Sequence, residues 1–496
     1  MIHAYSVEQI RAVEAVALAR DGDATLMRRA ATAVALAVVE RTPAPRPGRR
    51  VALLVGSGNN GGDALFAGAM LRGRGMAVTA VLLQPEKAHQ AGFVALRRAG
   101  GRIRRHDAPD VSTVIDRADI VVDGVVGLAA KPPLRPPAAA LIERANAGTA
   151  LRVAVDLPSG IDPDSGRVHG PAFLADATVT FGGIKTGLLV AAAQSGTVIC
   201  DAIGMDMSDR PAKLVGVTDG AVARLIPAPG PGADKFTGGL VGILAGSPGY
   251  PGAPVLCTGG AVRTRPGMVR YVGKQAAAVL ARWPEVVAVD DPATAGQVQA
   301  WVVGPGLGTD GAATALVRWA LSQDVPVLVD ADGLTVLAQS PSLLADRHRS
   351  GFPTVLTPHD REFARVFPRI DPGDRLAAVR RAAADSGATV LLKGHRTLVA
   401  APDGQATVNL SGSSWLATAG SGDVLAGLLG SLLAHHQAVA EVDDDRAAWL
   451  AACAAHVHGV AGALAVGAGR PITSSDISVA LPGAIARVRG WATAGD

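Results

Sequence analysis

Short apolar, β-branched runs alternate with helix-length segments along most of this chain, and the alternation occurs twice. In the first half the candidate strands are 51–55, 77–83, 119–123, 152–156, 177–181 and 197–201. In the second half they are 241–246, 301–304, 326–330, 354–357 and 389–394. Strands that alternate with helices predict a mostly parallel sheet covered on both faces, with ligands at the carboxyl ends of the strands. The sequence therefore predicts an α/β protein built from two separate units.

The Pro/Gly-rich stretch 226–234 marks the predicted boundary between these units. A length of 496 residues also favours two domains over one. We expect an N-terminal domain over 1–215 and a C-terminal domain over 225–496. Two helices are predicted over 7–40, breaking at Asp21-Gly22-Asp23, and the C-terminal end is predicted to be helical over 422–436, 446–468 and 476–490.

Composition excludes several classes of protein. Hydrophobic residues make up 49% of the chain and charged residues 18%, which is typical of a globular protein. The net charge of +4 comes from dispersed arginines, and aromatic residues are only 3%, so we expect no nucleic-acid partner. The most apolar segment, 446–468, carries Arg446, His456 and His458 and is predicted to be a buried helix, with no membrane partner.

The N-terminus lacks the features of a signal peptide, and three cysteines without metal-ligand spacing fit a reducing compartment. These features predict a cytoplasmic protein. We also expect the chain to form a homo-oligomer.

A glycine-rich segment, Gly56 to Asp63 (GSGNNGGD), follows the first strand and leads into a helix expected from about Asp63. Its glycines let backbone amides approach a phosphate, and the helix N-terminus adds partial positive charge. A turn that only binds an anion does not need the side-chain amides of Asn59 and Asn60. Amide oxygens of this kind can coordinate a monovalent cation. Asp123 and Asp156 each end a further strand. Either acid alone would more often be a turn or cap residue, but three clusters at three strand ends indicate a site.

Together these motifs resemble the NAD(P)H-hydrate epimerase family over about 1–215, which implies a Rossmann-like three-layer domain. By this resemblance, Asp156 faces the reacting ring as the catalytic acid/base. A potassium ion is implied at Asn60, Asp123 and Ser159. The implied substrate-binding residues are Asn59, Asn60, Gly61, Gly62, Asp63, Gly127, Leu128, Ala129, Ala130, Lys131, Pro132, Pro133 and Asp156.

In the C-terminal half the segment 419–430 (AGSGDVLAGLLG) is the most specific motif. Its glycines present backbone amides at a helix start, an arrangement that can hold a transferring phosphoryl group. Asp423 at that start can take the proton from an attacking hydroxyl. The pattern resembles ribokinase-like kinases and predicts a ribokinase-like α/β domain.

Five further segments accompany this motif: 235–239 (KFTGG), 245–253 (AGSPGYPGA), 303–308 (VGPGLG), 356–360 (LTPHD) and 393–397 (KGHRT). Their order resembles the ADP/ATP-dependent NAD(P)H-hydrate dehydratase family over about 225–490. The resemblance implies that Ala253, Gly306, His359 and Asp423 contact the hydrated nucleotide, with Asp423 catalytic. It also implies that ADP is the phosphoryl donor, with Mg²⁺ on its phosphates. The implied nucleotide-binding residues are Lys393, Gly394, His395, Arg396, Thr397 and Gly422.

The two resemblances predict one enzyme that repairs hydrated NADH and NADPH (NADHX and NADPHX), epimerising them and dehydrating one epimer at the expense of ADP to give AMP and phosphate. Two other interpretations stay open. The chain could be a ribokinase-like small-molecule kinase fused to a nucleotide-binding domain, because Gly420 to Asp423 fit that equally well. The N-terminal half could also be a binding module without catalysis, although Asp63, Asp123 and Asp156 weigh against this.

Overall fold

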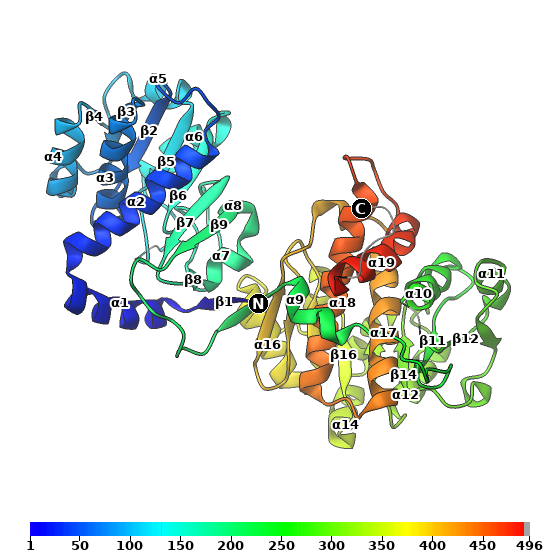
Figure 1. Cartoon of the computed structure of the whole chain (residues 1–496). Helices are drawn as coiled ribbons and strands as arrows, with labels where there is room; N and C mark the ends of the chain where they lie inside the picture. The colour runs from blue at the N-terminus through cyan, green and yellow to red at the C-terminus, as the bar shows by residue number, and fades with distance from the viewer. Residues whose placement is uncertain (130, 265, 491–496) are drawn as a thin grey trace. The chain divides into compact units, whose positions relative to one another are not determined.

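The computed structural model describes residues 1–129, 131–264 and 266–490, and the chain divides into two compact units (Figure 1). The N-terminal unit spans 3–214, and the C-terminal unit comprises 215–496 with residues 1–2. The Pro/Gly-rich stretch 226–234 thus lies inside the C-terminal unit instead of between the units. The reason is that a strand before this stretch, β10 (Leu214–Val217), pairs in parallel with a strand of the C-terminal sheet.

The N-terminal unit begins with two helices, as predicted. Ser6 forms a capping box with Gln9 at the start of the first helix, and Gly22, with a φ of 77°, separates the two. The strands of the unit are β1 (Ile2–Tyr5), β2 (Arg50–Val55), β3 (Ala77–Leu82), β4 (Arg102–Arg105), β5 (Ile120–Gly124), β6 (Leu151–Val155), β7 (Ala177–Phe181), β8 (Ile184–Lys185) and β9 (Thr197–Asp201). Its α-helices are α1 (Val7–Asp21), α2 (Asp23–Arg41), α3 (Asn59–Gly73), α4 (Gln90–Arg98), α5 (Val111–Asp116), α6 (Ala138–Ala147), α7 (Thr186–Val190) and α8 (Ala192–Ser195).

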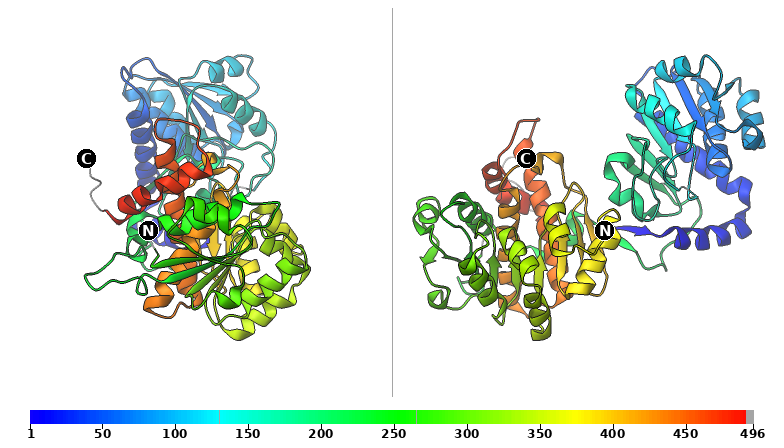
Figure 2. Two further views of the ribbon diagram at one scale, coloured as in Figure 1. Left: turned by 90° about the vertical axis from the view of Figure 1, so that its right-hand side faces the viewer. Right: turned by 180° about the vertical axis from the view of Figure 1, so that it is seen from behind.

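Seven of these strands form a parallel sheet in the order β4-β3-β2-β5-β6-β7-β9. One buried cluster packs α2 and α3 against the sheet, and a second packs α5 and α6 against it, so helices cover both faces (Figure 2). The chain runs outward from β2 to β4 and then returns to β5 on the other side of β2. The carboxyl ends of β2 and β5 therefore form a topological switch point, where parallel α/β sheets bind ligands.

The C-terminal unit contains the strands β10, β11 (Leu240–Leu244), β12 (Met268–Val272), β13 (Val287–Val289), β14 (Ala300–Val303), β15 (Val327–Val329), β16 (Thr354–Leu356), β17 (Thr389–Leu392), β18 (Leu398–Ala400) and β19 (Ala406–Asn409). Its α-helices are α9 (Asp219–Val222), α10 (Gly252–Arg263), α11 (Ala276–Arg282), α12 (Gly311–Leu321), α13 (Asp332–Gln339), α14 (Ser342–Ser350), α15 (Asp360–Val366), α16 (Arg375–Ser386), α17 (Ser421–Val439), α18 (Asp444–Val466) and α19 (Ser474–Arg489).

The strands of this unit follow the order β13-β12-β11-β14-β15-β16-β17-β18-β19-β10. All neighbours are parallel except the pairs β17–β18 and β18–β19. A second switch point lies between β11 and β14. The helix predicted as buried at 446–468 is α18. Its length and composition alone would suit a membrane span, but 83% of its most apolar window is buried inside the unit.

The strands predicted from apolar runs are confirmed as β2, β3, β5, β6, β7, β9, β11, β14, β15, β16 and β17. The prediction missed β1, β4, β8, β10, β12, β13, β18 and β19. Of these, β4 and β13 are edge strands of their sheets, and β12 lies next to β13. Edge strands need less apolar surface, and β4 is mainly arginine (RIRR). The predicted helix start near Asp63 is wrong, because α3 already begins at Asn59.

Candidate active sites

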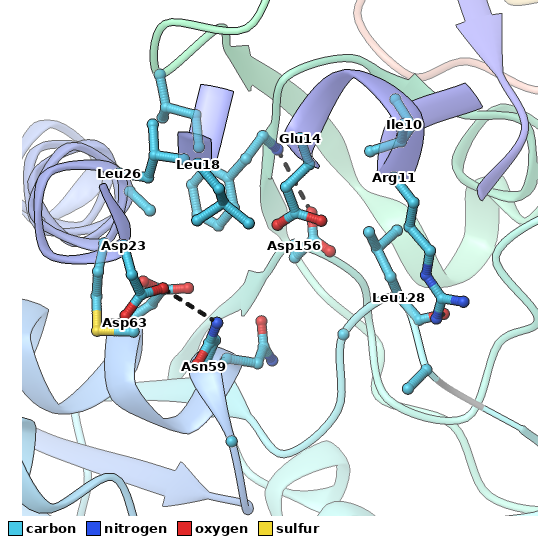
Figure 3. A pocket seen from close by; sticks show the side chains of 18 of the residues that line it. Ile10, Arg11, Glu14, Leu18, Asp23, Leu26, Asn59, Asp63, Leu128 and Asp156 are labelled. Atoms are coloured by element: carbon cyan, nitrogen blue, oxygen red, sulfur yellow. Dashed lines mark hydrogen bonds between the residues drawn. The ribbon is translucent and has the colours of Figure 1, made fainter. Parts of the chain in front are cut away.

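A cavity of about 380 Å³ opens at the switch point of the N-terminal unit (Figure 3). We call it the N-terminal pocket. The first two helices contribute Arg11, Glu14 and Asp23 to its lining. The start of α3 and the segments that follow the strands contribute Asn59, Asn60, Asp63, Gly127, Leu128, Ala129, Asp156 and Lys185. The structure thus brings together predicted residues from the loops after β2, β5 and β6.

Asp156 is the best positioned acid in this pocket. It follows β6 with a φ of 64°, unusual for a residue other than glycine, and it is 7% exposed. The Lys185 ammonium donates to its Oδ1 at 2.5 Å, and the Thr180 hydroxyl donates to the same oxygen at 3.2 Å. Lys185 itself is 1% exposed and also donates to the Phe181 carbonyl at 3.0 Å. Strained backbone and a buried ion pair facing a cavity are features of catalytic sites.

Other carboxyl groups in the pocket are biased toward their protonated forms. Burial raises the pKa of Asp63 well above its usual value, and the nearby charges of Asp156, Asp23 and Glu14 raise it further. Burial and Asp156 likewise raise the pKa of Glu14. The pocket therefore places carboxyl groups with raised pKa values close to a fixed lysine, which is typical of acid/base sites.

The glycine-rich segment has a different form from the one predicted. Only Gly56 to Gly58 form the turn, and Asn59 to Asp63 are the first turn of α3. Close packing explains the glycines: a Cβ on Gly56 would lie 1.9 Å from the Val125 carbonyl oxygen, and one on Gly61 would lie 2.3 Å from the Gly56 carbonyl oxygen. The backbone of this turn therefore lies directly against the loop after β5.

Asp123 lies beneath that loop and is fully buried. Its Oδ1 accepts from the Ser159 hydroxyl at 2.8 Å, and its Oδ2 accepts from the Ser159 amide at 2.7 Å. The Asn60 side-chain amide donates to the Val126 carbonyl at 2.9 Å, which turns its oxygen toward Gly127. Burial raises the pKa of Asp123 to about 6, although these hydrogen bonds lower it. Asp123 and Ser159 are thus hydrogen-bonded to each other, and Asn60 is linked to them through Val126, whose amide donates to the Ser159 hydroxyl at 3.3 Å.

In the C-terminal unit, charged side chains meet beside the start of α17. The Lys393 ammonium lies 2.7 Å from Asp330 Oδ1 and 3.6 Å from Glu362 Oε2. A Cβ on Gly422 would lie 3.3 Å from the same ammonium, so the glycine lets the helix start approach the ion pair. Burial raises the pKa of Asp423 to about 7, and Asp330 adds to this while Lys393 opposes it. Asp423 is therefore poised to exchange a proton near neutral pH.

The start of α17 also contacts α18 through Ser421 and His458. Gly420 has a φ of 82°, which favours glycine, and Ser421 Oγ lies 3.4 Å from Nε2 of the buried His458. Burial lowers the pKa of His458 to about 4, so its ring is neutral. The first amides of α17 lack intrahelical acceptors, as in every helix, and so can bind an anion.

The other predicted C-terminal residues occupy loops around this centre. Gly306 has a φ of 61°, and a Cβ there would lie 2.8 Å from the Ala253 Cβ, so these two residues are neighbours at the second switch point. His359 caps α15: its Nδ1 accepts from the Glu362 amide at 3.2 Å, and its side chain is 51% exposed. His359 Nε2 also lies 3.5 Å from Glu362 Oε1, and about half of the side chain stays exposed to a ligand.

The loop 393–397 is fixed by hydrogen bonds from side chains to backbone carbonyls. The Thr397 hydroxyl donates to the Gly394 carbonyl at 3.2 Å, and the Arg396 guanidinium donates to the Leu410 carbonyl at 2.6 Å. Arg375 donates to the Lys393 carbonyl at 3.0 Å. Lys393 was predicted from sequence to contact nucleotide phosphates, and here it pairs with Asp330.

Comparison with known proteins yields two family models on this chain. The one described as NAD(P)H-hydrate dehydratase matches residues 241–482, and the one described as YjeF-related protein N-terminus matches residues 23–187. A bifunctional NAD(P)H-hydrate repair enzyme of Mycobacterium leprae is 50% identical over 404 residues, covering 81% of this chain and 82% of that protein. The chain belongs to the bifunctional NAD(P)H-hydrate repair enzymes.

More distant relatives of this repair enzyme have the same description. That of Corynebacterium glutamicum is 36% identical over 472 residues, covering 80% of this chain and 81% of the relative. Among solved structures, an ADP/ATP-dependent NAD(P)H-hydrate dehydratase from Bacillus subtilis, co-crystallised with ATP/Mg²⁺, is 25% identical with a TM-score of 0.47. It covers 55% of this chain and 99% of that one.

Several residues of the repair enzyme's two centres were not predicted from the sequence, among them Lys185, Glu14 and Asp330. Lys185 and Glu14 lie beside Asp156, and Asp330 pairs with Lys393 near Asp423. Asp330 could have been found, because it ends a predicted strand just as Asp123 and Asp156 do. Of the predicted residues, Ala130 lies outside the described part of the chain, and Lys131, Pro132 and Pro133 line a separate cavity that adjoins the N-terminal pocket.

Proposed function

We propose that the N-terminal unit epimerises hydrated NAD(P)H in the N-terminal pocket and that the C-terminal unit dehydrates one epimer with ADP as phosphoryl donor. The observation that best supports this division is that each unit has its own acid next to a lysine, the buried Asp156 with Lys185 and the half-buried Asp423 near Lys393. The functional domains are expected to match 1–215 and 225–496. The cytoplasmic location and the homo-oligomeric state predicted from sequence belong to the same proposal.

In the proposed epimerisation, Asp156 accepts and returns the proton that moves when the ring is opened or ionised at C6. Lys185 holds the carboxylate in place through its bond to Oδ1. When the C6 hydroxyl takes a proton from the pocket and leaves as water, the ring nitrogen becomes positive, and the Asp156 carboxylate favours that charge. Gly127 and Leu128 would cover the ring from the loop after β5.

Potassium fits the cluster beneath the pocket. Asp123, Ser159 and Asn60 offer only oxygen donors toward a cation, which suits a hard ion over zinc. The Asp123 carboxylate is buried, and burial disfavours its charge, so a bound cation would stabilise it. When bound, the ion would fix the two loops that line the N-terminal pocket.

We expect a rubidium- or caesium-soaked crystal to show an anomalous peak within the Asp123–Ser159–Asn60 cluster, because these ions replace potassium on oxygen ligands. Asp123→Asn should remove the peak and lower the affinity for the ion. A soaked crystal with no peak there, or one in which nitrogen or sulfur atoms bind the ion, would contradict the potassium assignment.

In the proposed dehydration, the C6 hydroxyl attacks the β-phosphorus of ADP and AMP leaves. Asp423 takes the hydroxyl proton, and the amides at the start of α17 stabilise the transferring phosphoryl group. The ring nitrogen's lone pair then expels phosphate from C6. Loss of the proton from C5 forms the ring double bond and restores NAD(P)H.

Magnesium fits this site as a companion of the donor. Among the described residues, no group of three or more His, Cys, Asp or Glu side chains is arranged to hold a metal ion. Mg²⁺ commonly binds through substrate phosphates and water rather than through a full protein cage. Mg²⁺ would therefore enter the site bound to the phosphates of ADP and neutralise part of their charge. Lys393 lies beside the start of α17 and would add a second positive charge there.

The pKa of Asp423 predicts a pH profile for dehydration. The base must be ionised, so with a pKa of about 7 the value of kcat/KM should rise roughly tenfold between pH 6 and pH 8 and then level off. Initial rates of ADP-dependent NADH recovery measure this directly. A flat profile across that range would contradict the role of Asp423 as the base.

A further inference from the structure

A second cavity, of about 320 Å³, adjoins the N-terminal pocket. We call it the cationic cavity; it is lined by Gly56 and Ser57 on one side and by the segment 131–138 on the other. Ser57 and Ala129 line both cavities, so the two meet at the turn that leads into α3. A ligand longer than either cavity can therefore extend through both.

The two cavities differ in charge. The N-terminal pocket contains the carboxyl groups of Glu14, Asp23, Asp63 and Asp156, against the cations Arg11 and Lys185. The cationic cavity contains Lys131 and Arg135 and no acidic side chain among its described lining residues. Both of these cations are exposed.

The two halves of a hydrated dinucleotide differ in charge in the matching way. The hydrated nicotinamide ring carries no negative charge, and its nitrogen becomes positive when the C6 hydroxyl leaves. The remainder carries a pyrophosphate and adenosine, with a further 2′-phosphate in NADPHX. Charge complementarity thus directs the phosphate-bearing adenosine half toward Lys131 and Arg135 and leaves the ring to the N-terminal pocket, where Asp156 lies. The free amides at the start of α3, between the cavities, suit the pyrophosphate.

We propose that the cationic cavity binds the adenosine half of the substrate and that Lys131 and Arg135 bind the 2′-phosphate, so that NADPHX is preferred over NADHX. The inference rests on the proposed epimerase function of the N-terminal pocket. A phosphomonoester carries nearly two negative charges at neutral pH, and Arg and Lys bind it through charge-assisted hydrogen bonds. NADHX leaves the two cations in water, where they carry no desolvation penalty, so it still binds.

The test compares epimerisation of NADPHX and NADHX by the full-length protein without ADP, so that no epimer is consumed. In the double variant Lys131→Ala/Arg135→Ala, KM for NADPHX should rise about tenfold or more while kcat stays unchanged. KM for NADHX should change far less. Lys131→Arg should retain the preference, because it keeps the charge and the donors. Arg117→Ala, which removes an exposed arginine outside both cavities, is the matched control.

Three outcomes would overturn the inference. If the double variant epimerised both substrates with the same kcat/KM as the unaltered protein, the 2′-phosphate would not bind to Lys131 and Arg135. An equal loss for both substrates would show that the cations bind the shared pyrophosphate. Absence of epimerisation in the unaltered protein would overturn the proposed function and this inference together, and is thereby distinguished from the first two outcomes.

Discussion

Asp423→Asn is expected to lower ADP-dependent dehydration by about 10²–10⁴-fold while epimerisation continues at the rate of the unaltered protein. Asparagine keeps the shape of the side chain and can still form hydrogen bonds, but it cannot accept the hydroxyl proton. The residue lies in the first turn of α17, beside the glycine turn and the Lys393–Asp330 pair. Separate assays of NADH recovery and of epimer interconversion give the two rates.

The matched control is Asp443→Asn, which changes an exposed aspartate that caps α18. Asparagine caps helices as well as aspartate does, so stability and dehydration should both be retained. If Asp423→Asn dehydrated its substrate as fast as this control, Asp423 would only stabilise a helix start and the phosphoryl-transfer mechanism would lose its base.

Asp156→Asn is expected to have the opposite effect, lowering epimerisation by about 10²–10⁴-fold and leaving dehydration of the reactive epimer unchanged. The variant removes the acid/base group and also leaves Lys185 buried without its carboxylate. Removing one partner of a buried ion pair typically costs about 3–5 kcal/mol. A lower thermal transition of the N-terminal unit should therefore accompany the loss of activity.

A double variant separates chemistry from stability. In Asp156→Asn/Lys185→Met no unpaired charge is buried, so the thermal transition should recover much of the loss. Epimerisation should stay as low as in the single variant, because the proton-transfer group of Asp156 is still missing. If the double variant regained epimerisation, the Asp156–Lys185 pair would be structural only and another acid of the pocket would be the catalyst.

The local sequence pattern was sufficient to predict the site residues that lie at the ends of strands. Asp123 and Asp156 end apolar runs, and the glycine turn follows another, so the parallel topology brings their loops to one edge. The same rule places Ala253 near Gly306 across the second switch point. Which loops meet at a switch point follows from the order of the strands in the sheet. A chain of alternating strands and helices allows only a few such orders.

The missed residues depend on tertiary contacts that no local pattern records. Glu14 lies on α1 and reaches the pocket only because that helix packs across the strand ends. Lys185 follows a short turn after β7 in the sequence FGGIKTG, where a lysine is usually solvated. The start of α3 was predicted too late because the helix-unfavourable pair Gly61 and Gly62 lies inside its first turn. The close contacts of Gly61 with Gly56, and of Gly62 with His89 and Met27, explain why glycine is needed there.

The most direct test is to incubate the purified full-length protein with a mixture of NADHX epimers and to follow absorbance at the reduced-nicotinamide band. We expect no recovery of NADH without ADP, and complete recovery of both epimers when ADP and Mg²⁺ are added. Phosphate and AMP should appear in amounts equal to the NADH formed. Recovery that stops at the share of one epimer would contradict the epimerase assignment, and recovery without ADP would contradict the phosphoryl-transfer mechanism.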